Sequence, residues 1–427
     1  MRFARLGIVM MLFWCAAAPA DPGPMQVFQT RYYTIHTDLN LDDAREAAIR
    51  MTRMFEEYRH RTQGFSGEIH NRLPFYLFKT EADYHDAGGL PGSAGIFTGS
   101  ALMAVAGEHA DDSVWHIVQH EGFHQFARAV IRGDLPTWLN EGIAEYFGES
   151  LFTGDGFVSG LIPPSRLRRV QQEIRSGRFK SIKAMMFTGH EQWNRTMSIA
   201  NYDQAWSMVH FLAHAENGRY QTAFVSFMQL IGRGVQWPTA WKQTFGEADG
   251  FEERWKQWWL GLDANPTADL YAQVVASSLN SFLARTAAQG QRFEQFDDFL
   301  TAASNGNLKI GQGADQWLPP RLLKEAVEAA GRSHIKWSIE QTPWHGSQIV
   351  ALLPDDTRIT ASYVLRGSEA PQTTIDVDDT GTIVRQAHML IDQGKKDTAR
   401  VMLQQALRSH PRSQAADEAR ALLRQTQ

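Results

Sequence analysis

The amino-acid sequence predicts an α+β fold, and the distribution of strand-like and helical segments carries this prediction. Short strand-like segments precede residue 107, and helical periodicity with apolar faces dominates residues 114–262. Strand-like segments return at 335–377, and residues 380–427 are helical again. Because strands and helices are grouped instead of alternating regularly, we expect small sheets and largely separate helical parts.

The first twenty residues have the composition of a targeting segment. Arg2 and Arg5 form a positively charged start, residues 6–14 an apolar core, and Ala18-Pro19-Ala20 a small-residue cleavage site. The apolar run is too short to span a bilayer. We therefore expect residues 1–20 to be a signal peptide cleaved after Ala20, and the mature chain to be exported, periplasmic or secreted, without a transmembrane segment.

Cys15 is the single cysteine of the chain. A lipoprotein attached through Cys15 is the alternative, but Trp14 occupies the position where a lipid-attachment signal requires a small residue. Cleavage after Ala20 removes the only thiol, so the mature chain can form neither a disulfide nor a thiolate–metal bond. Any metal site must therefore be built from histidines and carboxylates.

Two strands and a hairpin are predicted ahead of the main helices. Residues 26–37 and 73–78 have the composition of strands, and between them Asp42 can cap an amphipathic helix. A glycine-rich loop leads to 95–97 and 102–106, which we expect to form the hairpin.

The next helix contains the stretch His-Glu-Gly-Phe-His at residues 120–124. His120 and His124 are four positions apart, so both imidazoles project from one helix face and can bind one metal ion. Glu121 lies one step around the helix and can reach a water molecule at that ion. His116 shares the face of the two histidines, but three ligands in a row on a straight helix cannot converge on an ion, because each turn advances about 5.4 Å.

A second predicted helix supplies the missing ligand. A catalytic zinc ion needs three protein ligands and an open position. Glu141 follows His124 by 17 positions, and Glu145 lies one turn further along the same face. Two free carboxylates four apart repel each other, whereas one that binds zinc and one that accepts a histidine N–H do not. The alternative for this pair is an ordinary solvated acidic face.

The histidine motif can also arise by chance. With 15 histidines in 427 residues, roughly a few per cent of such chains contain it. Here Asp111, Asp112 and Ser113 can cap a helix that runs without proline from Val114 to Ile131. This helical context and the nearby acidic helix favour a metal site over a chance match.

At these two stretches the chain resembles the gluzincins, the thermolysin-like and aminopeptidase-like zinc peptidases grouped as peptidase MA. The run Leu-Pro-Thr-Trp-Leu-Asn-Glu-Gly-Ile-Ala-Glu-Tyr-Phe at 135–147 is similar to that of bacterial members. The resemblance covers residues 26–262. It implies a zincin-like metallopeptidase domain with a small mixed sheet, active-site helices and a helical second lobe.

The resemblance also implies roles for individual residues. It implies Zn²⁺ bound by His120, His124 and Glu141, with Glu121 as general base, and with Glu145 and Asn140 supporting the ligands from behind. In the gluzincins an edge strand before the metal helix pairs with extended substrate, and residues 102–106 are the candidate here. An ordinary structural edge strand is the alternative for that segment.

Tyr202 is a candidate for stabilising the reacting carbonyl oxygen, again by resemblance. Aminopeptidase-like relatives use a tyrosine at the start of a helix downstream of the glutamate ligand, and Tyr202 opens such a helix. Those relatives continue with Glu-Lys-Gly, whereas this chain continues with Asp203-Gln204-Ala205. A core tyrosine at the start of an amphipathic helix is the alternative. On the same helix, His210 and His214 repeat the spacing of four without a following glutamate, so we expect surface or core histidines.

Beyond Asp263 the chain predicts accessory parts. We expect a helical connector at 264–330, a small β-rich region at 331–379 and a helical unit similar to a tetratricopeptide repeat (TPR) at 380–427. One such unit cannot bury its own apolar face, so it must pack on its neighbours or on a partner protein.

Two functions remain open at this point. The net charge of −5 argues against nucleic acid or an anionic membrane surface as the main partner. The first function is zinc-dependent hydrolysis of peptide bonds in a peptide or protein substrate. The alternative is a non-enzymatic cell-envelope scaffold that retains a zinc-bound peptidase fold. Glu121 favours hydrolysis, because a structural metal site needs no base.

Overall fold

The computed structural model describes residues 25–131, 133–196, 198–246, 248–342, 346–366 and 369–426. The expected signal peptide, with Cys15, lies outside these residues. Within them, no helix combines the length and the apolar character needed to cross a bilayer. The α+β prediction is confirmed, since helices are accompanied by small sheets.

The chain divides into two compact units. The N-terminal unit runs to Leu151 and resumes from Gly156 to Thr267, and the C-terminal unit comprises Phe152–Asp155 and Ala268–Gln427. This division differs from the sequence prediction, which placed the boundary after residue 262 and separated three C-terminal regions. Asp155 shows why four early residues join the C-terminal unit: its carboxylate forms a buried ion pair with Arg285, with separations of 2.8 and 2.9 Å.

The N-terminal unit contains a five-stranded sheet of order β1-β2-β3-β5-β4. Its strands are β1 Gln26–Gln29, β2 Tyr33–Thr37, β3 Leu73–Phe78, β4 Gly95–Phe97 and β5 Leu102–Val105. The three central strands are parallel, and both edge strands are antiparallel to their neighbours. The segment expected to lie at the edge, 102–106, is therefore internal, and β4 forms that edge instead.

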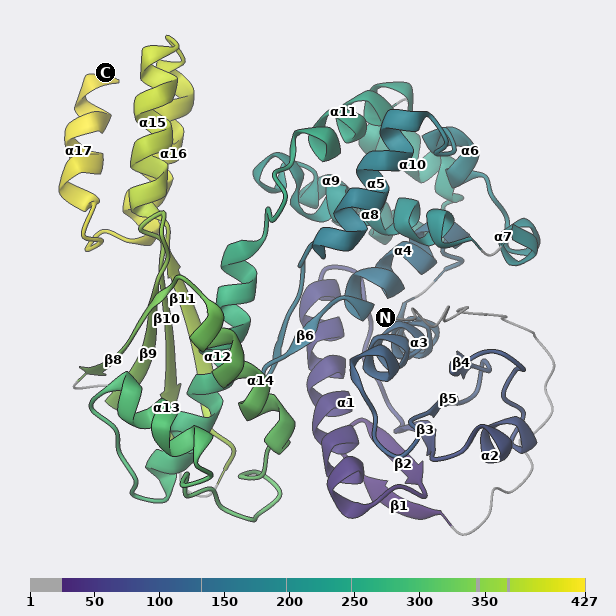
Figure 1. The fold of residues 1–427 in the computed structure, drawn as a ribbon. Coiled ribbons are helices and arrows are strands. Elements are labelled where there is room, and N and C mark those ends of the chain that lie inside the picture. The colour runs from purple at the N-terminus through teal and green to yellow at the C-terminus, as the bar shows by residue number, and fades with distance from the viewer. Residues whose placement is uncertain are drawn as a thin grey trace. The chain divides into compact units, whose positions relative to one another are not determined.

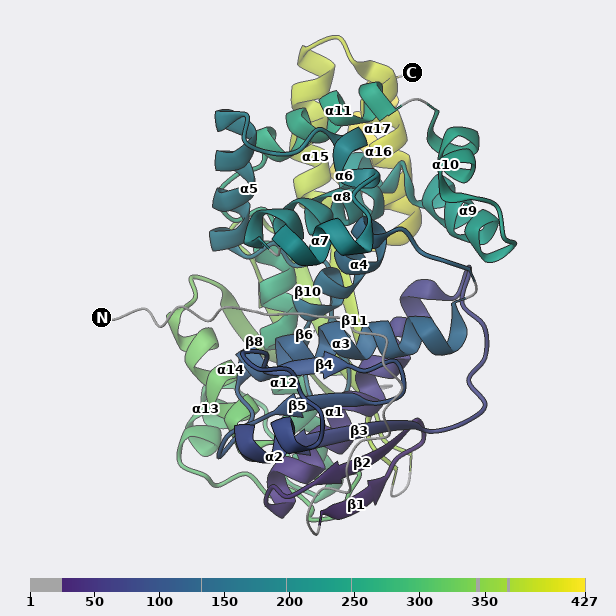
Figure 2. The same cartoon turned by 90° about the vertical axis from the view of Figure 1, so that its right-hand side faces the viewer.

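The first two helices of the N-terminal unit lie in the sequence between strands of the sheet, and the other helices follow its last strand. They are α1 Leu41–Thr62, α2 Glu81–Asp86, α3 Asp112–Val130, α4 Thr137–Gly148, α5 Pro164–Ser176, α6 Ile182–Met186, α7 His190–Thr196, α8 Ile199–Gly218, α9 Gln221–Gly232, α10 Trp237–Phe245 and α11 Ala248–Gly261. A two-stranded ribbon, β6 Leu151–Phe152 and β7 Phe157–Val158, follows α4. Figures 1 and 2 show α3 and α4 between the sheet and the group of helices α5–α11, so the two motif helices occupy the middle of this unit.

Close approaches at glycines fix the positions of α3 and α4. A Cβ atom on Gly95 would lie 2.5 Å from Ile117 Cγ2, so α3 packs directly on β4. A Cβ atom on Gly142 would lie 2.5 Å from the Ala205 carbonyl oxygen, so α4 packs equally closely on α8. These contacts pair α3 with β4 and α4 with α8, and α3 and α4 also pack on each other.

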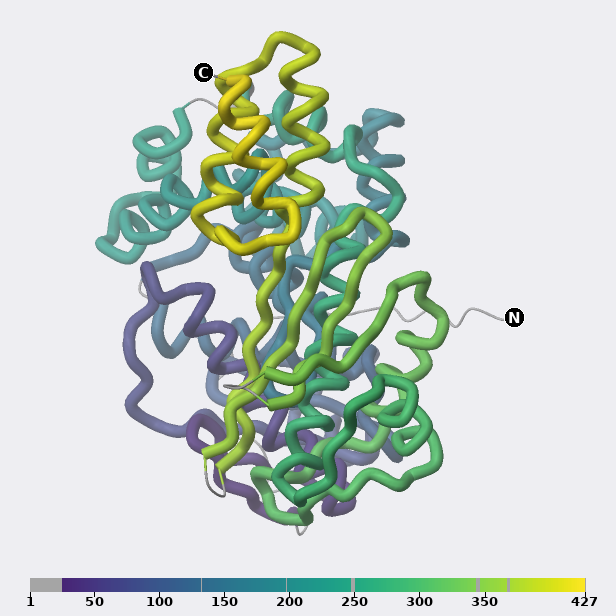
Figure 3. The backbone as a smooth tube through the Cα atoms, turned by 90° about the vertical axis from the view of Figure 1, so that its left-hand side faces the viewer, coloured from purple at the N-terminus to yellow at the C-terminus, as the bar shows by residue number. Residues whose placement is uncertain are grey.

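The C-terminal unit contains a four-stranded antiparallel sheet of order β11-β10-β9-β8. Its elements are α12 Ala268–Ala288, α13 Phe296–Ser304, α14 Pro320–Arg332, β8 Lys336–Thr342, β9 Gly346–Leu352, β10 Arg358–Val364, β11 Gln372–Asp378, α15 Thr380–Asp392, α16 Lys396–Ser409 and α17 Ala416–Gln425. Helix α12 packs on β9, β10 and β11. The three last helices pack on one another beyond the end of β11, as Figure 3 shows in yellow-green to yellow.

Candidate metal centre

Helix α3 presents His120 and His124 to the interior. Asp111 caps the helix by accepting hydrogen bonds from the backbone N–H groups of Ser113 and Val114. His120 is completely buried and His124 is 5% exposed. Their Nε2 atoms lie 3.1 Å apart, so the spacing of four residues brings both imidazole edges to one point as predicted.

Helix α4 brings Glu141 to the same point. Glu141 Oε2 lies 3.3 Å from His120 Nε2 and 3.6 Å from His124 Nε2. Zinc bonds of about 2.0–2.1 Å at tetrahedral angles place neighbouring ligand atoms roughly 3.3 Å apart. The three separations match this spacing, and two imidazole nitrogens with one carboxylate oxygen are a donor set that zinc accepts. The three predicted ligands therefore fit a zinc ion in both chemistry and spacing.

Glu121 is fixed beside the three ligands by the edge strand of the sheet. Its side chain is buried, and its Oε2 accepts a 2.8 Å hydrogen bond from the backbone N–H of Phe97 in β4. Burial raises the pKa of Glu121, while His124, His120 and the Phe97 N–H act in the opposite direction. A carboxylate whose pKa is raised in this way is suited to accept and return a proton near neutral pH.

Glu145 supports His120 from the opposite side. Its Oε1 lies 3.0 Å from His120 Nδ1, which turns His120 Nε2 toward Glu141. Burial alone would raise the pKa of Glu145, but Arg166, His116 and His120 hold it well below its usual range. An ionised carboxylate behind a ligating imidazole is the arrangement that orients histidines at metal sites.

The carboxylate of Glu141 and the imidazole of His120 shift each other's pKa. For Glu141, burial is opposed by His124 and His120, and the pKa falls to about 2. For His120, burial lowers the pKa, but Glu141 and Glu145 outweigh it and raise the value to about 10. The protein thus gathers negative charge around His120 that a divalent cation can neutralise.

A second acidic cluster lies next to the first. His116, Glu145 and Glu149 place three potential ligand atoms within 4.8 Å of one another. However, the guanidinium of Arg166 already lies 2.5 Å from Glu145 and 2.6 Å from Glu149. This cluster therefore has a cation of its own, supplied by α5.

Tyr202 reaches the metal centre from the start of α8. Its ring centroid lies 6.3 Å from that of His120, and its side chain is 8% exposed. Burial raises the pKa of Tyr202 and Glu141 raises it further, with smaller effects of Glu145 and Glu121, while a hydrogen bond with Trp193 acts in the opposite direction. The hydroxyl therefore stays protonated at neutral pH and can donate a hydrogen bond to an oxygen in the site.

Other residues considered in the sequence lie in different surroundings. Asn140 is half-buried, and in the described part of the chain its side chain makes no hydrogen bond to the two ligand histidines or to Glu141. His210 Nε2 lies 2.9 Å from the Gly160 carbonyl oxygen, and His214 Nε2 lies 2.9 Å from the Tyr146 hydroxyl.

Two contacts of the site were not foreseen. One is the Phe97 N–H, a backbone group that no sequence pattern identifies. The other is Arg166, whose position did leave a signal: Arg166, Val170 and Ile174 are spaced by four on the buried stripe of α5, where a charged residue needs a partner.

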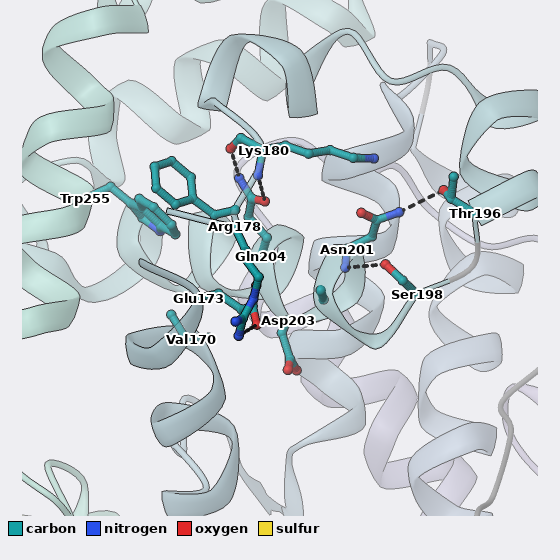
Figure 4. A pocket seen from close by; sticks show the side chains of 12 residues that line it. Val170, Glu173, Arg178, Lys180, Thr196, Ser198, Asn201, Asp203, Gln204 and Trp255 are labelled. Atoms are coloured by element: carbon teal, nitrogen blue, oxygen red, sulfur yellow. Dashed lines mark hydrogen bonds and ion pairs between the residues drawn. The ribbon is translucent and has the colours of Figure 1, made fainter. Parts of the chain in front are cut away.

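A pocket of about 250 Å³ lies on another side of the first turns of α8 (Figure 4). Its lining includes Asn201, Asp203 and Gln204, the neighbours of Tyr202, together with Lys180. The Gln204 amide is paired with the backbone of Lys180 through hydrogen bonds of 2.6 and 3.1 Å. These bonds hold the first turns of α8, and with them Tyr202, in place.

Comparison with protein families gives a match for part of the chain. Residues 115–233 match the family described as "Protein of unknown function (DUF1570)". The matched segment contains the three potential metal ligands, Glu121, Glu145, Arg166 and Tyr202. A search among curated proteins finds no match.

Proposed function

We propose that the protein is an exported zinc metallopeptidase whose N-terminal unit is a zincin-like domain of the gluzincin kind. The convergence of His120 Nε2, His124 Nε2 and Glu141 Oε2 at zinc-like separations supports this proposal most directly. The presence of a buried carboxylate beside them favours hydrolysis over a purely structural metal site. In the C-terminal unit, we propose that α15–α17 form a TPR-like unit available to a protein partner.

The residues around the centre divide the chemistry among them. A zinc ion held by the three ligands would polarise the substrate carbonyl and lower the pKa of water to about 7. Glu121 takes a proton from the attacking water and later delivers it to the leaving amine. Because Oε2 of Glu121 is held by the Phe97 N–H, its other oxygen remains for the water.

Tyr202 would stabilise the negative charge that forms on the substrate during the reaction. As water adds to the peptide carbonyl, negative charge develops on the carbonyl oxygen. A protonated hydroxyl at the edge of the site can donate a hydrogen bond to that oxygen. One such donor typically contributes about 10²–10³ in rate.

The proposal is tested by metal content and peptide cleavage on the full mature chain. We expect about one zinc per wild-type molecule and cleavage of a peptide library. Glu121→Gln should retain the zinc and lose about 10²–10⁴ in turnover, because only the proton acceptor is removed. Glu68→Gln, at an exposed position, is the matched control and should behave as wild type.

Two results would contradict the proposal. Undiminished cleavage by E121Q would remove Glu121 from the reaction. Zinc-loaded wild-type protein that cleaves no member of a broad library would support the scaffold alternative instead.

A further inference from the structure

Arg166 joins three acidic side chains from two helices through one guanidinium group. Its Nη2 lies 2.5 Å from Glu145 and its Nη1 2.6 Å from Glu149, both on or at the end of α4. Its Nε lies 2.8 Å from Asp203 Oδ1 on α8. The Arg166 side chain is only 4% exposed, and its partners Glu145 and Asp203 are buried, whereas Glu149 is partly exposed.

The surroundings of Arg166 hold the guanidinium plane in one orientation. The group lies over the Trp206 ring at 4.5 Å from its centroid, and Trp206 belongs to α8 as Asp203 does. A planar group with fixed donor directions can bind carboxylates on several sides at once, which an ammonium cannot. The arrangement therefore links α4 to α8 through one side chain.

Two short chains of contacts lead from Arg166 to the centre. Along the first, Glu145 accepts from Arg166 through Oε2 and contacts His120 Nδ1 through Oε1, at 3.0 Å. Along the second, Asp203 follows Tyr202 directly in the sequence, so that anchoring Asp203 also anchors the turn that carries Tyr202. One side chain thus supports both a potential metal ligand and the potential oxyanion donor.

We propose that Arg166 is a positioning residue for the metal centre, acting through Glu145 on His120 and through Asp203 on the first turn of α8. This inference rests on the part of the proposed function that places zinc at the site, and it does not require peptide cleavage. Arg166 has the role here that a second cation would have in the His116, Glu145 and Glu149 cluster, so we expect a single metal ion per chain.

Arg169 provides a matched control on the same helix. Its guanidinium contacts Asp203 at 2.6 and 2.9 Å, but its side chain is 45% exposed, and its contact is to Asp203 and not to Glu145. A substitution at Arg169 therefore removes one arginine–Asp203 pair while leaving the connection to His120 intact.

The test measures zinc affinity by competition with a chromophoric chelator, with no substrate present. Arg166→Met should weaken zinc binding by about 10- to 100-fold, the usual effect of losing support behind a ligating histidine. Arg169→Met should stay within about threefold of wild type. Cobalt-substituted R166M should also show an altered visible absorption spectrum, because the geometry at His120 changes.

A double substitution separates positioning from general destabilisation. If Arg166 acts through Glu145, zinc affinity in the E145Q/R166M chain should be no lower than in E145Q alone. Should R166M fail to fold because the buried Glu145 loses its cation, Arg166→Lys keeps the charge but cannot reach all three carboxylates, and should still weaken zinc binding by about tenfold.

Each remaining outcome decides against the inference. Wild-type affinity and spectrum in R166M, or in R166K where that is used, would overturn the role of Arg166 while leaving the metal centre in place. Additive losses in the double variant would assign Arg166 an independent structural effect. A wild-type chain that binds no zinc would overturn this inference together with the proposed function, whereas a zinc-binding chain without peptidase activity would overturn the proposed function alone.

Discussion

The N-terminal unit contains two histidine pairs with the same spacing and opposite surroundings. His120 and His124 on α3 have ring centroids 4.8 Å apart, and His210 and His214 on α8 have ring centroids 4.7 Å apart. Each pair also contacts a tyrosine ring. The first pair faces Glu141, whereas the second faces the carbonyl oxygen of Gly160 and the hydroxyl of Tyr146.

This difference in facing groups shifts the histidine pKa values of the two pairs in opposite directions. Carboxylates raise the pKa of His120 to about 10 against the effect of burial. Burial lowers the pKa of His210 to about 3 and that of His214 to about 4, and His214 and Arg61, respectively, lower these values further. A spacing of four therefore creates the opportunity for a metal site, and the carboxylate on the facing helix decides whether the site can hold a cation.

The largest effect, on zinc content, should follow from removing the carboxylate that faces His120 and His124, so that this pair resembles His210 and His214. Glu141→Ala removes the facing carboxylate, and we expect zinc content to fall from about one per molecule to near zero, because two histidines alone are an incomplete ligand set. Metal analysis after dialysis is the measurement. The control His214→Gln changes the other histidine pair and should retain full zinc. Full zinc content in E141A would show that the third ligand is another residue, with Glu145 next in position.

The two tyrosines offer the next contrast. Tyr202→Phe should lower kcat by about 10²–10³ with nearly unchanged KM and zinc content, because it removes a donor that acts on charge formed only during reaction. Tyr146→Phe removes a hydroxyl beside the second histidine pair and should leave kcat near wild type. Equal turnover in Y202F and wild type would show that Tyr202 is a core residue.

A smaller effect is expected at Glu145. Glu145→Gln keeps the size of the side chain but removes the charge behind His120, so zinc affinity should fall by about 10- to 100-fold without being abolished. Isothermal titration with zinc in a competing buffer measures the change. An affinity equal to that of the wild type would exclude Glu145 as a support for the ligand.

The extent to which the sequence predicted the site follows from the range of the interactions. His120 and His124 lie about one helical turn apart, so their common face, with Glu121 one step around the helix, follows from helix geometry alone. Glu141 could be inferred because a second acidic helix follows at short range. Arg166 could not be placed, because its partners come from two other helices, and only its position on an apolar stripe indicated burial.

The order of strands shows the same limit. The hairpin of β4 and β5 was predicted from its local pattern and is present in the structure. Which of the two strands lies inside the sheet depends on pairing with β3, more than twenty residues earlier. A local pattern does not carry that information, so β5 was wrongly expected at the edge and β4 was overlooked as the strand that holds Glu121.

The second histidine pair predicts an acid-sensitive fold, the smallest of these effects. The pKa of His214 is about 4 in the folded chain, below the ordinary value of about 6.5 for an unfolded chain. Between these values the unfolded state binds more protons, so the free energy of unfolding falls as pH falls from about 6.5 toward 4, by up to about 1.4 kcal/mol per pH unit for one group.

Urea unfolding of the metal-free chain at pH 7, 6 and 5 measures this, and the difference between wild type and His214→Asn isolates His214 from the other titrating groups. H214N should show a shallower loss of stability toward pH 5, whereas His70→Asn, at an exposed position, should keep the wild-type profile. Parallel curves for H214N and wild type would show that His214 is not held neutral by burial, and the contrast between the two histidine pairs would then rest on the metal ligands alone.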